Sequence, residues 1–294
     1  MNTPRYYVPA RSHWPIVGAV AVFLTILAIA RSIQESSEGD VSVTTYLVIA
    51  MAGVLMLYML FGWFGEVIRE GLAGLNSDQL KKSFRISMGW FIFSEVMFFA
   101  GFFGALFYAR VISVPWLGGE GDKGISNMLW EGFTAQWPLL QTPDPEQFPG
   151  ATSTISAWGL PFVNTILLVV SSITLTIAHH RLRENLKSQT LIWLGLTLAL
   201  GFAFLCVQIY EYGHAMNDLG LTLNAGIYGS TFFMLTGFHG AHVTLGAIML
   251  LVMFLRVKRD HFTPNDHFGF EAAAWYWHFV DVVWLLLFAF VYVL

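Results

Sequence analysis

The chain has 294 residues, of which 56% are hydrophobic and only 12% are charged. A soluble domain averages about 25% charged residues, so this composition excludes an ordinary water-soluble fold. The net charge is −4 and no basic block occurs, which argues against a nucleic-acid partner. The single cysteine, Cys206, excludes a disulfide within the chain.

Seven apolar stretches predict an all-α membrane protein in which residues 1–294 form a single seven-helix membrane domain. The first stretch is long enough to span, and no small-residue cleavage site follows it, so we do not interpret it as a cleavable signal. About 20 helical residues cross the ~30 Å hydrocarbon layer, where helices satisfy every backbone polar group internally. The expected spans are 14–34, 43–64, 84–108, 157–180, 189–212, 229–255 and 272–294.

The distribution of basic residues predicts an orientation, because loops on the inner side of a membrane are enriched in Lys and Arg. With the N-terminus on the cytoplasmic (or matrix) side and the C-terminus outside, twelve basic residues lie inside and three outside. The inner set is Arg5, Arg11, Arg69, Lys81, Lys82, Arg85, Arg181, Arg183, Lys187, Arg256, Lys258 and Arg259. The outer set is Arg31, Arg110 and Lys123.

The connection at 109–156 is long, lies on the outer side, and is rich in Gly, Pro and Trp. Loops of this length are usually functional or dock on another surface, although a mobile surface insertion would have the same composition. No internal repeat is visible, so the sequence gives no support to an inverted-repeat transporter.

Ionisable residues inside a membrane are expensive and are functional candidates by default. Glu95 lies in the middle of the third span, where it either exchanges protons or is a protonated carboxyl group that hydrogen-bonds a neighbouring helix. His239 and His242 share one face of the sixth span, and His278 and Asp281 share one face of the last. For His278 and Asp281 we favour polar contacts that hold helices together.

A metal site made of His239, His242, His278 and Asp281 would be chemically adequate for a divalent ion. The nine histidines are nevertheless scattered over different depths. Four are at the inner surface and His214 is near the outer side, which argues against a membrane metalloenzyme. We therefore assign no metal ligand and no catalytic residue. At this point a channel, a transporter, an enzyme and an accessory subunit all remain open.

The residues 267–285, HFGFEAAAWYWHFVDVVWL, resemble the closing motif of the cytochrome c oxidase subunit III family. Residues 227–233 and 236–243 are similar to the family's sixth helix, and 94–103 to its third. Weaker similarity occurs at 14–15, 67–70 and 178–180, so the resemblance extends along the whole chain. The segment 74–78 departs from it, because many members carry a His pair there. The long outer loop looks like that of bacterial, aa3-type members.

The resemblance implies a non-redox core subunit of a proton-pumping oxidase, with no catalytic centre or cofactor in this chain. Haem and copper would lie in partner subunits. The seven helices would divide into two and five, with phospholipid in a cleft between them. The partners would be subunits I and II, phospholipids and, through the complex, cytochrome c. The location would be a bacterial inner membrane, with the N-terminus cytoplasmic and the C-terminus periplasmic. The function would be support of subunit I stability and of proton uptake during aerobic respiration.

The resemblance also assigns roles to individual residues. Glu95 would be the family's buried glutamate of the third helix. Trp63, Glu70 and Arg256 match positions associated with lipid head groups, and His13 would be a proton-entry candidate near the inner face. His239, His242, His278 and Asp281 remain structural polar candidates.

Two alternatives keep the membrane fold but change the function. A quinol-oxidising haem-copper enzyme has an equivalent subunit, but those relatives commonly have five helices, and the two additional N-terminal spans favour the cytochrome c branch. A stand-alone proton-coupled transporter would account for Glu95 and Asp281. It would need a polar path or broken helices at mid-depth, whereas the second and fourth spans are nearly free of charge.

Overall fold

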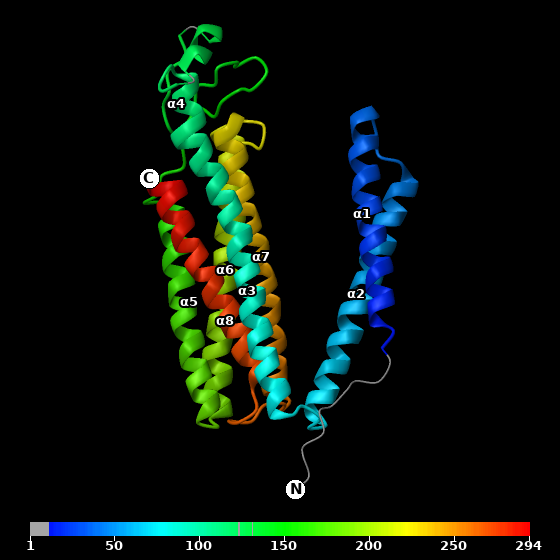
Figure 1. Ribbon diagram of the computed structural model, residues 1–294. Helices are drawn as coiled ribbons and strands as arrows, with labels where there is room; N and C mark the ends of the chain where they lie inside the picture. Colours follow the sequence, from blue (N-terminus) through cyan, green and yellow to red (C-terminus); the bar gives the residue numbers. More distant parts are fainter. Residues whose placement is uncertain (1–11, 123, 131) are drawn as a thin grey trace. The chain divides into compact units, whose positions relative to one another are not determined.

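The computed structural model describes residues 12–122, 124–130 and 132–294. These residues form helices and no β-strand (Figure 1). Seven helical segments among them are long and apolar enough to cross a membrane, which confirms the predicted all-α, seven-span fold. Three residues used for the orientation, Arg5, Arg11 and Lys123, lie outside the described part of the chain. The long helices are α1 (Trp14–Glu38), α2 (Val43–Leu72), α3 (Asp78–Phe107), α5 (Leu160–Arg183), α6 (Lys187–Asp218), α7 (Gly226–Lys258) and α8 (Phe268–Leu287).

The chain divides into two compact units, residues 1–84 and residues 85–294. The first contains α1 and α2, and the second contains most of α3 together with α5, α6, α7 and α8. This division agrees with the expected grouping of two helices and five.

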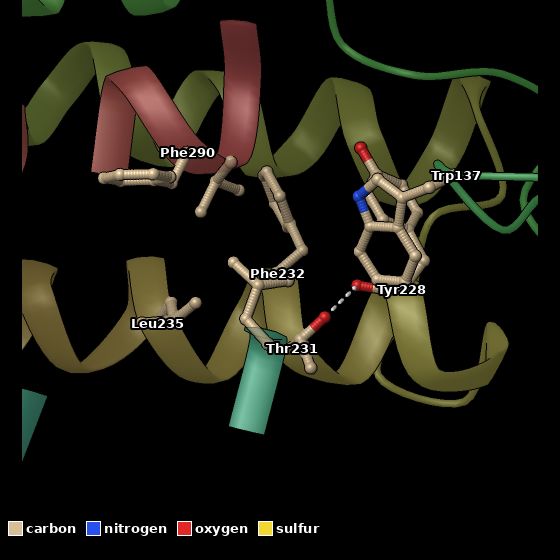
Figure 2. Close-up of a pocket in the computed structure, with 8 residues that line it drawn as sticks. Trp137, Tyr228, Thr231, Phe232, Leu235 and Phe290 are labelled. Carbon is tan, nitrogen blue, oxygen red and sulfur yellow. Dashed lines mark hydrogen bonds between the residues drawn. The ribbon is translucent and has the colours of Figure 1, made fainter. Parts of the chain in front are cut away.

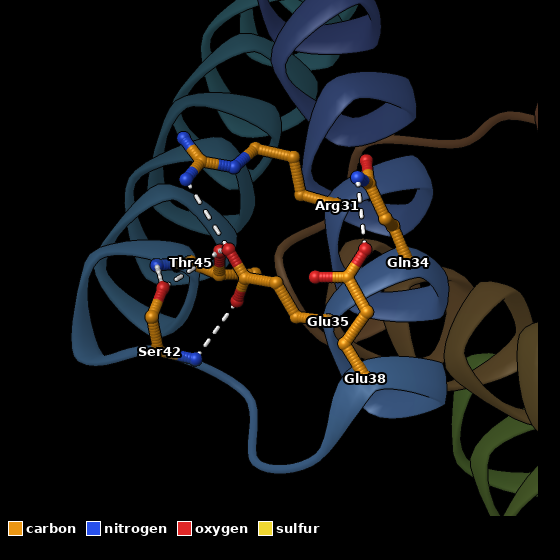
Figure 3. A network of polar contacts seen from close by, with 6 residues as sticks. All are labelled: Arg31, Gln34, Glu35, Glu38, Ser42 and Thr45. Atoms are coloured by element: carbon orange, nitrogen blue, oxygen red, sulfur yellow. Dashed lines mark hydrogen bonds and ion pairs between the residues drawn. The ribbon is translucent and has the colours of Figure 1, made fainter.

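A polar network closes the turn between α1 and α2 in the first unit (Figure 3). Glu35 accepts hydrogen bonds from the backbone N–H of Ser42 at 2.8 Å, the hydroxyl of Thr45 at 2.9 Å and the guanidinium of Arg31 at 3.2 Å. The Ser42 hydroxyl in turn accepts from the Thr45 N–H and caps α2. Gly39 has a φ of 147°, a conformation that side-chain-bearing residues rarely adopt, and so allows the chain to reverse.

The same two helices are joined at their other end by Trp14. Its indole N–H donates to the Glu66 carboxylate. Its ring covers Gly62, where a Cβ atom would overlap the ring. The hairpin is therefore held by polar contacts at both ends and by a ring-on-glycine contact that only Gly62 permits.

The second unit is organised around Trp277 of α8, whose side chain is completely buried. Its indole N–H donates to Ser171 of α5 at 2.9 Å. A Cβ atom at Gly201 of α6 would lie 2.7 Å from the ring, and one at Gly246 of α7 would lie 2.9 Å from it. Four helices thus meet at one indole, because two of them present glycine to it.

Helix α3 joins this bundle through aromatic side chains. Phe98 packs edge-on against Phe238 of α7, with ring centroids 5.1 Å apart. Phe99, which is 2% exposed, lies 6.2 Å from Phe279 of α8, and Phe91 stacks with Tyr276. These rings fill the space between α3 and its neighbours, since a phenyl ring is large and has few rotatable bonds.

The segment 109–156 contains the π-helix η1 (Tyr108–Ser113), the short α4 (Val114–Leu117) and the 3-10 helix η2 (Gly124–Leu129). Its later part packs against the C-terminal end of α6 and the N-terminal end of α7, where Leu139 and Ala151 are buried. Trp137 packs edge-on against Tyr228, with 5.8 Å between ring centroids, and both rings line a small, mostly apolar pocket (Figure 2). Part of the segment therefore packs against helices of its own unit.

The role of Trp277 can be tested with two glycines of α7. Gly246→Ala should lower stability by about 1–3 kcal/mol, because the new methyl group meets the buried ring and the core is overpacked. Gly240→Ala is the matched control. A Cβ there has nothing within 4 Å, so the substitution should be neutral or slightly stabilising through helix propensity. Thermal unfolding in mild detergent measures the stability of both variants. Equal unfolding midpoints would contradict the proposal that Trp277 requires glycine at position 246.

Candidate functional site

The half-buried carboxyl group of Glu95 in α3 pairs with a histidine of α7. Glu95 Oε2 lies 2.8 Å from His242 Nε2, although the two residues are 147 positions apart. The side chains remain 22% and 14% exposed, so the pair lies at the edge of the unit and not in its centre. This contact brings together two residues that the sequence singled out separately.

The second nitrogen of His242 constrains where protons sit in the pair. Nδ1 lies 2.6 Å from the backbone carbonyl of Phe238, and since a carbonyl oxygen only accepts, Nδ1 must carry a proton. Nε2 then either accepts from a protonated Glu95 or, in an imidazolium, donates to the Glu95 carboxylate. In both arrangements the pair shares one proton along the 2.8 Å hydrogen bond and has no net charge.

Aromatic rings surround the shared proton. The His242 ring lies 4.9 Å from Phe99 and 5.8 Å from Phe98, and it stacks with Tyr276 at 6.4 Å. The Tyr276 side chain is 1% exposed, and its hydroxyl has no hydrogen-bond partner among the described residues. The surroundings are therefore largely apolar, with one unused phenol nearby. Sequence reasoning did not select Tyr276, which looked like one more aromatic residue of the closing motif.

His239 shares a helical face with His242 but faces the bundle core. It is 1% exposed, and its Nε2 donates to the Val280 carbonyl of α8 at 3.1 Å. Its ring packs 5.1 Å from Trp284 and 5.7 Å from Phe204. These contacts link α7 to α8 and suit a helix-joining residue.

His278 and Asp281 both face α5. His278 Nδ1 lies 3.3 Å from the Ser172 hydroxyl, and Nε2 lies 3.4 Å from the Thr176 hydroxyl. Asp281 is 9% exposed and also lies beside Ser172. The polar residues of α8 thus contact hydroxyl groups across the helix interface, and the sequence analysis had not named those hydroxyl groups.

The four residues considered for a metal face three different neighbours. His239 faces Val280, His242 faces Glu95, and both His278 and Asp281 face Ser172 of α5. Within the part of the chain that the structure describes, no group of three or more His, Cys, Asp or Glu side chains is arranged to hold a metal ion.

The lipid candidates belong to different units. Trp63 is 46% exposed and stacks on Phe64, and Glu70 lies near the end of α2, both in the first unit. Arg256 belongs to the second unit, where its guanidinium lies 4.3 Å from the centroid of Phe262. Partial burial and the charges of Arg256 and Arg259 lower the pKa of His261 in the loop that follows.

The proton-entry candidate, His13, is exposed at the start of α1. Its ring lies 4.2 Å from that of Trp14. Its solvent-accessible position is compatible with proton exchange but equally suits a solvated surface residue.

Comparison with known proteins assigns the chain to a family. A family model described as cytochrome c oxidase subunit III matches residues 4–143 and 134–294. Proteins named cytochrome c oxidase subunit 3 from Gadus morhua, Oncorhynchus mykiss and Dugong dugon are 40%, 38% and 37% identical to this chain. The alignments cover 98%, 98% and 99% of this chain and 96%, 96% and 97% of the relatives. The chain belongs to the cytochrome c oxidase subunit III family.

Family membership confirms the resemblance found in the sequence. The chain is a multi-pass membrane subunit of an oxidoreductase complex, and members of this family do not carry the redox centres. The comparisons favour neither the quinol-oxidising alternative nor the stand-alone transporter. The pairing of Glu95 with His242 adds a defined geometry to this assignment.

The Glu95–His242 pair gives a stability prediction. Glu95→Gln should be tolerated, because the amide N–H can still donate to His242 Nε2. His242→Leu should cost about 1–3 kcal/mol, since it leaves the Glu95 carboxyl group without its partner. His214→Leu is the control, because His214 pairs with Asp218 in an exposed position where ion pairs contribute little. Thermal unfolding of the three variants should rank His242→Leu lowest, and a Glu95→Gln midpoint equally low would contradict the assigned hydrogen bond.

Proposed function

We propose that this chain is a non-redox core subunit III of a proton-pumping, aa3-type cytochrome c oxidase in a bacterial inner membrane. It has no catalytic centre, packs against subunits I and II, and meets cytochrome c only through the complex. Haem and copper lie in the partner subunits. The N-terminus is cytoplasmic and the C-terminus periplasmic, as the twelve inner and three outer basic residues indicate.

The observation that carries the proton-related part of this proposal is the hydrogen bond between Glu95 and His242. A pair that holds one proton with no net charge can lie in a membrane without the cost of an isolated ion. The proton can move between Oε2 and Nε2 because both atoms serve as either donor or acceptor.

The position of the pair supports exchange with a neighbouring subunit. Both side chains keep part of their surface exposed on the second unit, at a depth within the spans α3 and α7. We propose that subunit I covers this surface and that the pair supports proton uptake there. His13 remains a weaker candidate for proton entry, since it is an exposed residue near the inner face.

Removal of this chain from the complex tests the subunit role. The remaining oxidase should keep its visible haem spectrum, because the redox centres lie in other subunits, and its activity should decline during continuous turnover. Absorption spectra and oxygen-consumption traces recorded with and without the chain measure both effects. Immediate and complete loss of the haem spectrum would show that the chain is required for assembly instead.

The variant Glu95→Gln in the intact complex tests whether the carboxyl group itself supports proton uptake, because the subunit remains in place. The haem spectrum should be unchanged, while proton uptake measured with a pH-sensitive dye should slow. If the subunit is retained and the rate of proton uptake is unchanged, the proposed role of the pair is wrong.

We also propose that Trp63, Glu70 and Arg256 contact phospholipid head groups. Trp63 is exposed at the inner end of α2, and Arg256 is a cation at the inner end of α7. The double variant Trp63→Ala/Arg256→Ala should lower the phospholipid that co-purifies with the complex, as measured by mass spectrometry. Trp90→Ala, which removes another exposed Trp, is the control and should retain the lipid. Unchanged lipid in the double variant would exclude these residues as head-group contacts.

A further inference from the structure

The second unit also contains a fully buried carboxyl group, which belongs to α6. Glu211 of α6 is completely buried, and the hydroxyl of Tyr292 donates to its Oε1 at 2.6 Å. The nearest histidine along the helix, His214, forms its own pair with Asp218 at 2.7 Å. Glu211 therefore has a phenol as its partner, whereas Glu95 has an imidazole.

Two buried amides adjoin Glu211. Gln208 precedes it by three residues on the same face of α6 and is 5% exposed, and Asn164 of α5 is completely buried. The Asn164 amide N–H donates to Gln208 Oε1 at 3.4 Å. The Gln208 side chain also lies beside the hydroxyl groups of Tyr292 and Tyr212, so the carboxyl, amide and phenol groups form one cluster.

Several buried polar atoms of this cluster lack a hydrogen-bond partner. Asn164 Oδ1, Gln208 Nε2 and Glu211 Oε2 are all buried, and none of them forms a hydrogen bond of standard length and angle with the described residues. Exchanging O and N in both amides would still leave one donor and one acceptor unpaired. A buried polar group without a partner destabilises the fold, and buried polar groups in folded proteins are nearly always bonded to protein or to ordered water.

We propose that Asn164, Gln208 and Glu211 form a binding site for ordered water inside the bundle. One water molecule can accept from Gln208 Nε2 and donate to Asn164 Oδ1 and Glu211 Oε2, which is the usual number of about three hydrogen bonds for a buried water. If Glu211 carries a proton on Oε2, the same water accepts it in place of one donation. The site therefore satisfies all three atoms in either protonation state of Glu211.

The local backbone points to the same cluster. Tyr292 lies in η3 (Phe288–Val293), a π-helical segment that continues α8. π-helical turns are rare and occur frequently at functional sites, because they reposition side chains relative to an α-helix. Here the segment carries the phenol that binds Glu211.

The water site is independent of the role proposed for Glu95 and His242, since it uses different residues and different helices. It would make Glu211 a hydrated carboxyl group connected to α5, α6 and η3. The proposed ligand is water, which a structure of the resting complex can show without any measurement of activity.

The test is a structure of the intact oxidase complex in lipid nanodiscs at a resolution that resolves water. Density for at least one water should lie within about 3.2 Å of both Gln208 Nε2 and Glu211 Oε2. The proposal is overturned if the site is dry, or if the three atoms bond directly to protein groups. The wild-type map alone gives this answer, so it does not depend on the folding of a variant.

Two variants sharpen the result. Gln208→Leu removes the donor and should abolish the water density. Thr197→Val is the matched control in the same α5–α6 interface, because the Thr197 hydroxyl already bonds Thr174 at 2.8 Å and the Trp193 carbonyl at 2.9 Å. The control should leave the water in place. Density that persists unchanged in Gln208→Leu would show that these residues do not bind it.

Discussion

The second unit depends on the burial of Trp277 between glycines. An indole has the largest ring system of any side chain, and its N–H needs a partner once it is buried. Gly201 and Gly246 give room for the ring, and Ser171 accepts its N–H. In lipid, helices gain little from a hydrophobic effect between them, so close packing and such hydrogen bonds hold the bundle together. Trp277 therefore contacts α5, α6 and α7 at once and restricts how these helices can slide along α8.

This restriction determines where the polar residues of α7 lie. With Gly246 against Trp277, His239 lies against Trp284 and the Val280 carbonyl. His242 then faces α3, where aromatic rings leave a position for Glu95. The position of the candidate proton site thus follows from core packing of Gly246 and His239, four and three residues from His242, and a shift of α7 along its axis would separate the pair.

Hydropathy was sufficient for the fold, because each span is a long apolar segment and the membrane permits only helices there. The high free-energy cost of placing an ionisable side chain in a membrane also identified Glu95 and the histidines as candidates. Helical periodicity could not predict which residues these side chains contact. His239 and His242 are three residues apart on one side of α7, but His239 contacts α8 and His242 contacts α3. Residues three apart differ by about 60° around a helix axis, and tertiary packing decides which neighbour each one meets. Asn164, Gln208 and Ser172 were missed because an uncharged polar residue in a span gives a weak signal.

The half-buried Glu95 and the fully buried Glu211 of the second unit differ in the chemistry of their partners. Glu95 faces an imidazole whose other nitrogen is fixed as a donor, so a proton can cross from oxygen to nitrogen while the pair as a whole stays neutral. Glu211 faces a neutral phenol that already donates its proton to the carboxyl group, and a neutral hydroxyl group takes up an additional proton only as a strongly acidic cation. A proton leaving Glu211 therefore requires a different acceptor. The unpaired atoms of Asn164 and Gln208 lie where a bound water would provide one.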